Sequence, residues 1–157
     1  MKALLCKTLG LPETLLYEDT TDPQPGPGQV LVEMKAAGVN FPDALIIQGK
    51  YQFKPALPFA PGAELAGVVV QVGEGVKNTR PGDRVIAMCT HGAFAEKVLV
   101  QAKQIIPMPP ALSFEAAASF TLAYGTSYHA LKGRAQLKEG ETLLVLGAAG
   151  GVGLAAI

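Results

Sequence analysis

The sequence has 157 residues, enough for one compact domain or for one domain with part of a second. Hydrophobic residues make up 49% of it and charged residues 17%, which supplies a buried core and excludes a disordered chain. Thirteen Lys and Arg residues balance thirteen Asp and Glu residues, so no basic surface for nucleic acid or acidic lipid is expected, and no apolar run is long enough to cross a bilayer.

The first two-thirds of the chain is predicted to form short β-strands. Apolar or alternating segments are separated by turns rich in Gly and Pro, a pattern typical of a β-barrel or sandwich. The run LAGVVVQV is almost continuously apolar, which favours a strand buried on both faces. The expected strands are Met1–Cys6, Gln29–Ala37, Leu65–Val72, Arg84–Met88 and Phe94–Val100.

Helical signals begin after Pro107. Ser113 is a suitable N-cap and Glu115 lies in the first turn that follows it. A second helix is predicted over Thr121–Arg134, although a glycine within it lowers the helix propensity. The apolar segment Thr142–Leu146 is then predicted to be a strand, and residues 154–157 to be the first turn of another helix.

A glycine-rich loop, GAAGGVG (147–153), lies between that strand and that helix. Glycines let the backbone approach a pyrophosphate closely, and a helix N-terminus offers free N–H groups to the anion. The order of strand, glycine loop and helix predicts a nicotinamide dinucleotide site, with an ordinary tight connection as the alternative. The expected cofactor-binding residues are Ala149, Gly150, Gly151, Val152 and Gly153.

The chain carries two cysteines, Cys6 and Cys89, which are far apart and form no CxxC pair. A secreted chain of this size more often has a disulfide framework. The first residues also contain too short an apolar stretch for a signal peptide. We therefore expect two reduced thiols with packing roles in a cytoplasmic protein.

Several motifs together resemble the zinc-free quinone oxidoreductases, or ζ-crystallin-like proteins, of the medium-chain dehydrogenase/reductase superfamily. Besides the glycine loop, they are AGVNFPD (37–43), GKY (49–51), PGAELAG (61–67), PGDRV (81–85) and GAFAE (92–96). They occur in the family's order and cover essentially the whole sequence. The chain is thus identified as the N-terminal part of such a protein.

The resemblance implies a β-rich, GroES-like, partly open barrel followed by the start of an α/β Rossmann domain. Residues 1–122 would form the substrate-binding domain, and residues 123–157 the linking helix and the opening of the dinucleotide-binding domain. The substrate would lie in the cleft between the two domains. The resemblance also implies NADPH as the cofactor, with NADH left open, and a homodimer of the full-length protein.

Two positions in these motifs bear on metal binding. Zinc alcohol dehydrogenases of the superfamily place a Cys where Asn40 stands and a His where Ala63 stands. His91 and His129 are isolated and do not pair at metal-ligand spacing. We therefore expect no metal, with His91 as a loop residue near a turn and His129 as a helix-surface or packed residue.

The resemblance assigns catalytic roles to Asn40, Asp43 and Tyr51. The Asn40 carboxamide would lie near the nicotinamide and donate a hydrogen bond to an acceptor carbonyl. The Tyr51 phenol would line the substrate pocket and donate a proton or a hydrogen bond. The alternatives are a turn-capping pair for Asn40 and Asp43 and a half-buried aromatic for Tyr51. Thr126 would contact the cofactor amide, with a plain helix position as its alternative.

The predicted function is transfer of hydride from a nicotinamide cofactor to a quinone, without zinc. Many relatives have Tyr and Arg where this chain has Leu45 and Ile47, which leaves fewer polar groups near the acceptor. An apolar enone or enoyl substrate is therefore an alternative, and so is a non-catalytic binding protein on the same fold.

Overall fold

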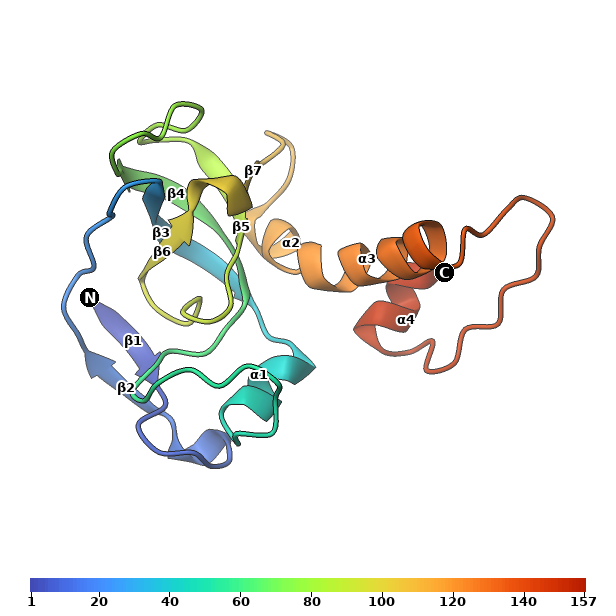
Figure 1. The fold of residues 1–157 in the computed structure, drawn as a ribbon, viewed down its shortest axis with the longest axis horizontal. Helices are drawn as coiled ribbons and strands as arrows, with labels where there is room; N and C mark the ends of the chain where they lie inside the picture. The colour runs from blue at the N-terminus through green and yellow to red at the C-terminus, as the bar shows by residue number, and fades with distance from the viewer. The chain divides into compact units, whose positions relative to one another are not determined.

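A computed structural model describes residues 1–157, and they divide into two compact units, Met1–Ala118 and Ser119–Ile157. The first unit contains all the strands of the protein (Figure 1). The second contains two helices and the loop that joins them. The expected domain boundary, after residue 122, stays a prediction.

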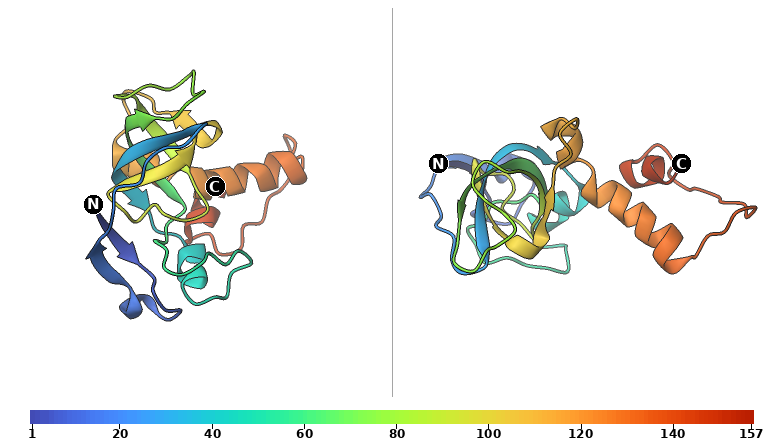
Figure 2. Two further views of the ribbon diagram at one scale, coloured as in Figure 1. Left: turned by 60° about the vertical axis from the view of Figure 1, so that its left-hand side comes forward. Right: turned by 90° about the horizontal axis from the view of Figure 1, so that it is seen from above.

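The first unit is built on a five-stranded antiparallel sheet in the order β6-β3-β4-β5-β7. Figure 2 shows these strands curling around one another, yet β6 and β7 are not paired and the sheet stays open. The expected partly open barrel is therefore confirmed. The strands are β3 (Gln29–Gly38), β4 (Glu64–Val72), β5 (Arg84–Met88), β6 (Lys97–Gln101) and β7 (Ile105–Pro107).

A two-stranded ribbon, β1 (Lys2–Leu5) with β2 (Leu16–Asp19), lies beside this sheet. It explains why β6 begins three residues later than the sequence predicts. The backbone N–H of Leu4 donates to the Phe94 carbonyl at 2.9 Å, and that of Glu96 donates to the Lys2 carbonyl at 3.0 Å. Residues 94–96 thus pair with the ribbon before the chain joins the large sheet.

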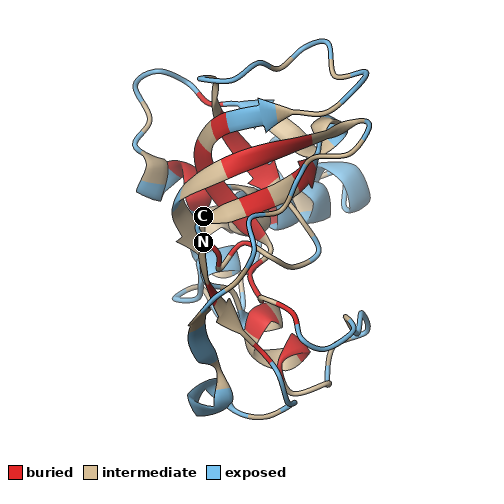
Figure 3. Ribbon diagram, turned by 90° about the vertical axis from the view of Figure 1, so that its left-hand side faces the viewer, coloured by how far each residue is buried: buried red, intermediate tan, exposed pale blue.

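Buried residues concentrate along the sheet, as Figure 3 shows. The prediction that the run 65–72 is buried on both faces is correct only for its first half, because Val70 and Gln71 are exposed. Helix α2 (Phe114–Ala118) packs on β3 and β4 and buries Ala117 and Ala118 with Ile86. The main core cluster consists of Val30, Val32, Leu65, Val69, Val85, Ala87, Ala93, Val98 and Val100.

The second unit contains α3 (Thr121–Tyr128), which a π-helical turn extends through His129–Arg134, and α4 (Gly151–Ala156). The predicted helix over Thr121–Arg134 is therefore confirmed, and α4 begins three residues earlier than expected. The prediction of a strand at Thr142–Leu146 is wrong. A strand needs a hydrogen-bonded neighbour, and no segment of the described chain pairs with this one. Every helix of the structure is too short or too polar to span a bilayer.

The N-cap of α2 gives a test of how local sequence stabilises the fold. The Ser113 hydroxyl accepts a hydrogen bond from the Ala116 N–H at 3.2 Å, as the sequence predicts. We expect Ser113→Ala to lower the free energy of unfolding by about 1 kcal/mol, because it removes this acceptor. Ser113→Asp keeps an acceptor and should retain the parental stability in urea denaturation. An equal loss in both variants would contradict the capping role.

Candidate functional site

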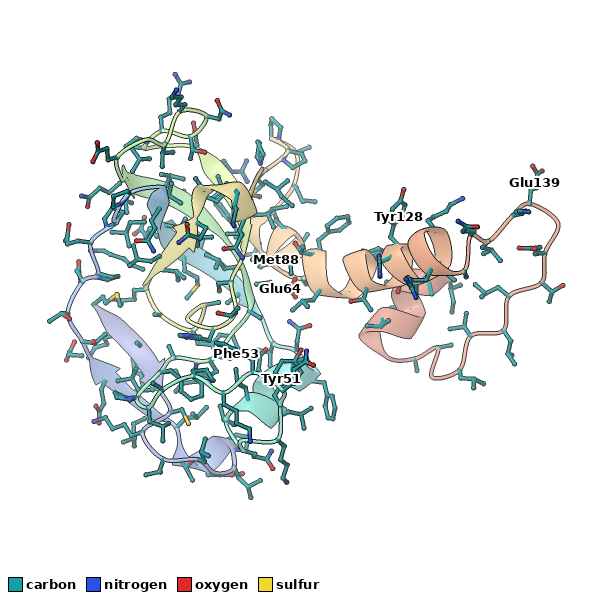
Figure 4. The ribbon with its side chains drawn as sticks, in the orientation of Figure 1. Tyr51, Phe53, Glu64, Met88, Tyr128 and Glu139 are labelled. Carbon is teal, nitrogen blue, oxygen red and sulfur yellow. The ribbon has the colours of Figure 1, made fainter.

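Three loops leave the large sheet at the same end of its inner strands, which is called the site end below. Because neighbouring strands are antiparallel, the end of β3, the start of β4 and the end of β5 coincide, with Glu64 opposite both Gly38 and Met88. Figure 4 labels Glu64 and Met88 on these adjacent strands. Asn40 and Cys89 lie just beyond these strand ends. They are therefore both at the site end of the sheet, although 48 residues separate them in sequence.

Asn40 is held at the site end by two separate contacts. It is the N-cap residue of α1 (Phe41–Ile46), and its backbone N–H donates to Asp43 Oδ2 at 2.7 Å. Its side-chain Nδ2 donates to Glu64 Oε1 at 2.8 Å. The side-chain amide is therefore directed toward the sheet by a partner from β4, while the local cap is made by Asp43.

Glu64 is a site residue that sequence reasoning missed. Its side chain is 1% exposed, although a carboxyl is costly to remove from water. Space for it comes from Gly38, since a Cβ there would overlap Glu64 Oε1 and lie 2.6 Å from the Ala118 carbonyl oxygen. The only signal in the sequence was an acidic residue at the head of an apolar run.

Asp43 is also buried, at 6% exposure. Burial raises the pKa of its carboxyl above the ordinary value of 3.8, and the nearby charge of Glu64 adds to this. Backbone N–H groups of Asn40 and Gly62 act in the opposite direction on the pKa. Two carboxyls therefore share a poorly hydrated region beside the Asn40 amide.

Cys89 belongs to the same region. Burial, and then the charge of Asp43, raises the pKa of its thiol to about 11, so the thiol stays protonated at neutral pH. Its Sγ lies 3.6 Å from the Gly62 carbonyl oxygen. Cys6, the other cysteine, is fully buried, and burial raises its thiol pKa as well. Both thiols are unpaired.

His91 packs between aromatic rings. Its ring centroid lies 5.9 Å from that of Phe53, in a stacked geometry, and 5.8 Å from that of Phe59, edge to face. Burial lowers the pKa of the imidazole, and a hydrogen bond with the Ala60 backbone opposes this. No group of three His, Cys, Asp or Glu side chains is placed to hold a metal ion.

Tyr51 follows α1 and is half-buried, near Phe53 in the loop labelled in Figure 4. Its ring packs against a small apolar cluster that includes Ile46, Ile47 and Phe59. Its predicted place next to a substrate stays a prediction, as do the roles of Asn40 and Asp43.

The glycine loop lies in the second unit. Gly153 is required there by close packing, because a Cβ would overlap the Gly147 carbonyl oxygen and lie 2.9 Å from Ala148 Cα. Helix α4 starts directly after Gly150, the N-cap residue. The loop and α3 line a cavity of about 500 Å3. Four of the six predicted cofactor residues line it, namely Gly150, Gly151, Val152 and Gly153, whereas Ala149 does not.

Thr126, the predicted cofactor contact on α3, is exposed and does not line this cavity. Its neighbour Ser127 is 3% exposed and donates from Oγ to the Val152 carbonyl at 2.6 Å. Ser127 thus ties α3 to the glycine loop. Sequence reasoning missed this residue, because a serine within a helix carries no signal for a partner 25 positions away.

The alcohol dehydrogenase GroES-like domain matches residues 26–110. The sea anemone Nematostella vectensis has a quinone oxidoreductase-like protein 2 homolog that is 42% identical over 99% of this chain and 43% of its own length. The rat synaptic vesicle membrane protein VAT-1 homolog is 47% identical over 86% of this chain and 33% of its own. The chain therefore spans less than half the length of these curated relatives.

A solved structure of Escherichia coli quinone oxidoreductase complexed with NADPH is similar in both fold and sequence. It superposes with a TM-score of 0.94 and is 38% identical, covering 99% of this chain and 48% of its own. The likeness includes both the sheet and the glycine loop, since nearly the whole chain is matched. The expected resemblance to quinone oxidoreductases is therefore confirmed.

The pKa of Asp43 predicts a pH dependence of stability. Because the folded-state pKa of Asp43 is raised, protonation of this carboxyl adds to the free energy of unfolding. This stabilisation is present below the unfolded-state pKa of 3.8 and is lost as the pH rises through the folded-state pKa. Asp43→Asn keeps an oxygen acceptor for the Asn40 N–H and cannot ionise. We expect its stability, relative to the parent, to increase between about pH 3.5 and pH 7 in urea denaturation.

Asp19 supplies a control of opposite sign. A hydrogen bond from Lys2 lowers the pKa of this exposed carboxyl. Its small contribution to the free energy of unfolding is therefore present above pH 3.8 and is lost as the pH falls. Asp19→Asn should therefore lose stability relative to the parent as the pH rises. A parallel response of the two variants would refute the assignment for Asp43.

Proposed function

Because the chain belongs to the medium-chain dehydrogenase/reductase superfamily, whose alcohol dehydrogenase GroES-like domain it carries, we propose that the protein is an NADPH-dependent quinone oxidoreductase. Quinone, NADPH and one proton give hydroquinone and NADP⁺. The bound cofactor supplies the hydride, and the protein supplies orientation and exclusion of water. The supporting observation is the anchored Asn40 amide, at the position where zinc-dependent relatives place a thiolate.

On the acceptor side, Asn40 supplies a hydrogen-bond donor. The side-chain amide has two N–H bonds, and one of them is directed to Glu64. The other is the group proposed to bind a quinone oxygen, where negative charge develops as hydride arrives. Tyr51 is proposed as a second donor through its phenol, and Asp43 as the residue that fixes the Asn40 backbone.

On the cofactor side, the glycine loop is proposed to bind the pyrophosphate. The residues fit this group: Gly150, Gly151 and Gly153 leave the backbone uncovered, and side chains at 150 and 153 would meet the Gly147 carbonyl. Backbone N–H groups at the start of α4 would be the donors. NADPH is proposed over NADH because the E. coli relative was solved with NADPH. Thr126 is kept as a proposed contact to the cofactor amide.

The reaction is proposed to proceed without zinc. Asn40 and Ala63 occupy the two positions at which the zinc enzymes have Cys and His, and an amide with a methyl group is a poor ligand set. The buried Glu64 carboxyl is instead engaged with the Asn40 amide. A quinone accepts hydride readily without a Lewis acid, whereas the zinc enzymes use the metal to polarise the alcohol or ketone oxygen.

There are two alternatives to this function. Leu45 is apolar, which suits an enone or enoyl acceptor, and such an acceptor could use the same hydrogen-bond donor at Asn40. Ile47 is buried among apolar side chains and does not distinguish the acceptors. A fold alone does not prove an activity, so a non-catalytic binding protein on this fold is the other alternative. NADPH binding without oxidation by any quinone or enone would favour the latter.

The first test is activity together with metal content. The full natural chain should oxidise NADPH when a quinone is added, faster than NADH at equal concentration. Elemental analysis should find no stoichiometric zinc, and a chelator should leave the rate unchanged. Stoichiometric zinc whose removal abolishes activity would refute the zinc-free proposal.

The second test separates acceptor binding from cofactor binding. Asn40→Ala should lower kcat by roughly a hundredfold, because one preorganised donor is lost, and Tyr51→Phe should lower it as well. The Kd for NADPH should change little in either variant, since neither side chain belongs to the glycine loop. Parental turnover in both variants would show that the acceptor site has been misassigned.

A further inference from the structure

We propose that Glu64 is a positioning residue, which acts on the reaction by holding the Asn40 carboxamide in one orientation. The inference rests on the proposed function, because Asn40 has to face an acceptor for its orientation to matter. It adds a residue that makes no proposed contact with either substrate. The argument depends on the burial of Glu64, on the direction of its hydrogen bond and on the second anchor of Asn40.

The fold makes room for this carboxyl at a structural cost. Glu64 is 1% exposed at the first position of β4, and the residue opposite it on β3 is Gly38. A Cβ at position 38 would overlap Glu64 Oε1, so this close approach depends on the absence of a side chain. An apolar residue at position 64 would avoid the desolvation of a carboxyl. Packing therefore does not account for a glutamate here.

The hydrogen bond defines which way the Asn40 amide faces. Glu64 Oε1 is the acceptor of the hydrogen bond from the Asn40 side chain, so it favours Nδ2 over Oδ1 of the amide at this position. With Nδ2 2.8 Å from Glu64 Oε1, rotation of the amide by half a turn would bring two oxygens together. Glu64 thus removes the ambiguity that an asparagine side chain otherwise has.

The backbone of Asn40 is anchored independently. Its N–H donates to Asp43 Oδ2, and its carbonyl accepts from the Asp43 N–H at 3.0 Å. Loss of Glu64 would therefore remove the partner of Asn40 Nδ2, while the capping box with Asp43 keeps the start of α1 in place. A donor that samples two orientations stabilises developing charge less well than a fixed one.

Glu64→Gln is the variant that tests this step. Glutamine has nearly the same volume, so the buried space stays filled. Its amide can present either an oxygen or an NH2 group to Asn40, so it no longer enforces one orientation. We expect kcat to fall by about tenfold, with little change in the Kd for NADPH.

A double-mutant cycle distinguishes positioning from a structural role. In the Asn40→Ala background, Glu64→Gln should cause no further loss of kcat, because the residue through which it acts is gone. Val69→Ala, a core substitution in the same strand, should lower Tm in both backgrounds and leave kcat unchanged. If Glu64→Gln instead lowers kcat equally in both backgrounds, the positioning role is overturned.

A readout independent of activity separates this proposal from the proposed function. Selective 15N-asparagine labelling of the full natural chain resolves side-chain amide pairs, and Asn40→Ala and Asn78→Ala assign the pairs of Asn40 and Asn78. Glu64→Gln should shift the Asn40 pair and leave the Asn78 pair in place. An unmoved Asn40 pair overturns the positioning whatever the activity. If the Asn40 pair shifts but the parent protein reduces no quinone, the proposed function is overturned. The positioning of Asn40 by Glu64 then has no role in catalysis.

Discussion

The candidate site depends on one constraint, a carboxyl group that is buried at the start of the central strand of the large sheet. Glu64 lies where β3, β4 and β5 meet, and it is almost completely removed from water. Burial of a charged group is tolerated only where donors compensate it, and the Asn40 amide is one such donor. Gly38 has to lack a side chain for this to happen. The site and the sheet are therefore parts of one packing arrangement.

The antiparallel topology explains why the site assembles from distant segments. Because neighbouring strands run in opposite directions, the loop after β3, the loop before β4 and the loop after β5 all leave the sheet at the same end. Asn40, Ala63 and Cys89 come together for this reason. The region that they form is poor in water, since Glu64 and Asp43 beside them are 1% and 6% exposed. In such surroundings, a fixed hydrogen-bond donor has a stronger electrostatic effect than it would have in solvent.

The second unit shows how tertiary contacts select among helix residues. Two neighbours on α3 differ in burial: Thr126 is exposed, whereas Ser127 is buried and donates to the backbone of α4. Gly153 allows the loop to fold closely over its own helix start. The apolar segment Thr142–Leu146 forms no strand, because strand formation depends on pairing rather than on the apolar character of a segment alone.

By itself, the sequence determined what local chemistry controls: the alternating segment of β3, the strand β5 after its Pro-Gly-Asp turn, the N-cap at Ser113, and motifs specific enough to identify the superfamily. The tertiary structure decided what depends on distant partners. Glu64 lies just before the strand expected at Leu65–Val72, and only its position opposite Gly38 and its hydrogen bond from the Asn40 side chain make it part of the site. The physical reason is that burial and side-chain hydrogen bonds across 24 residues follow from strand register, which no local pattern encodes.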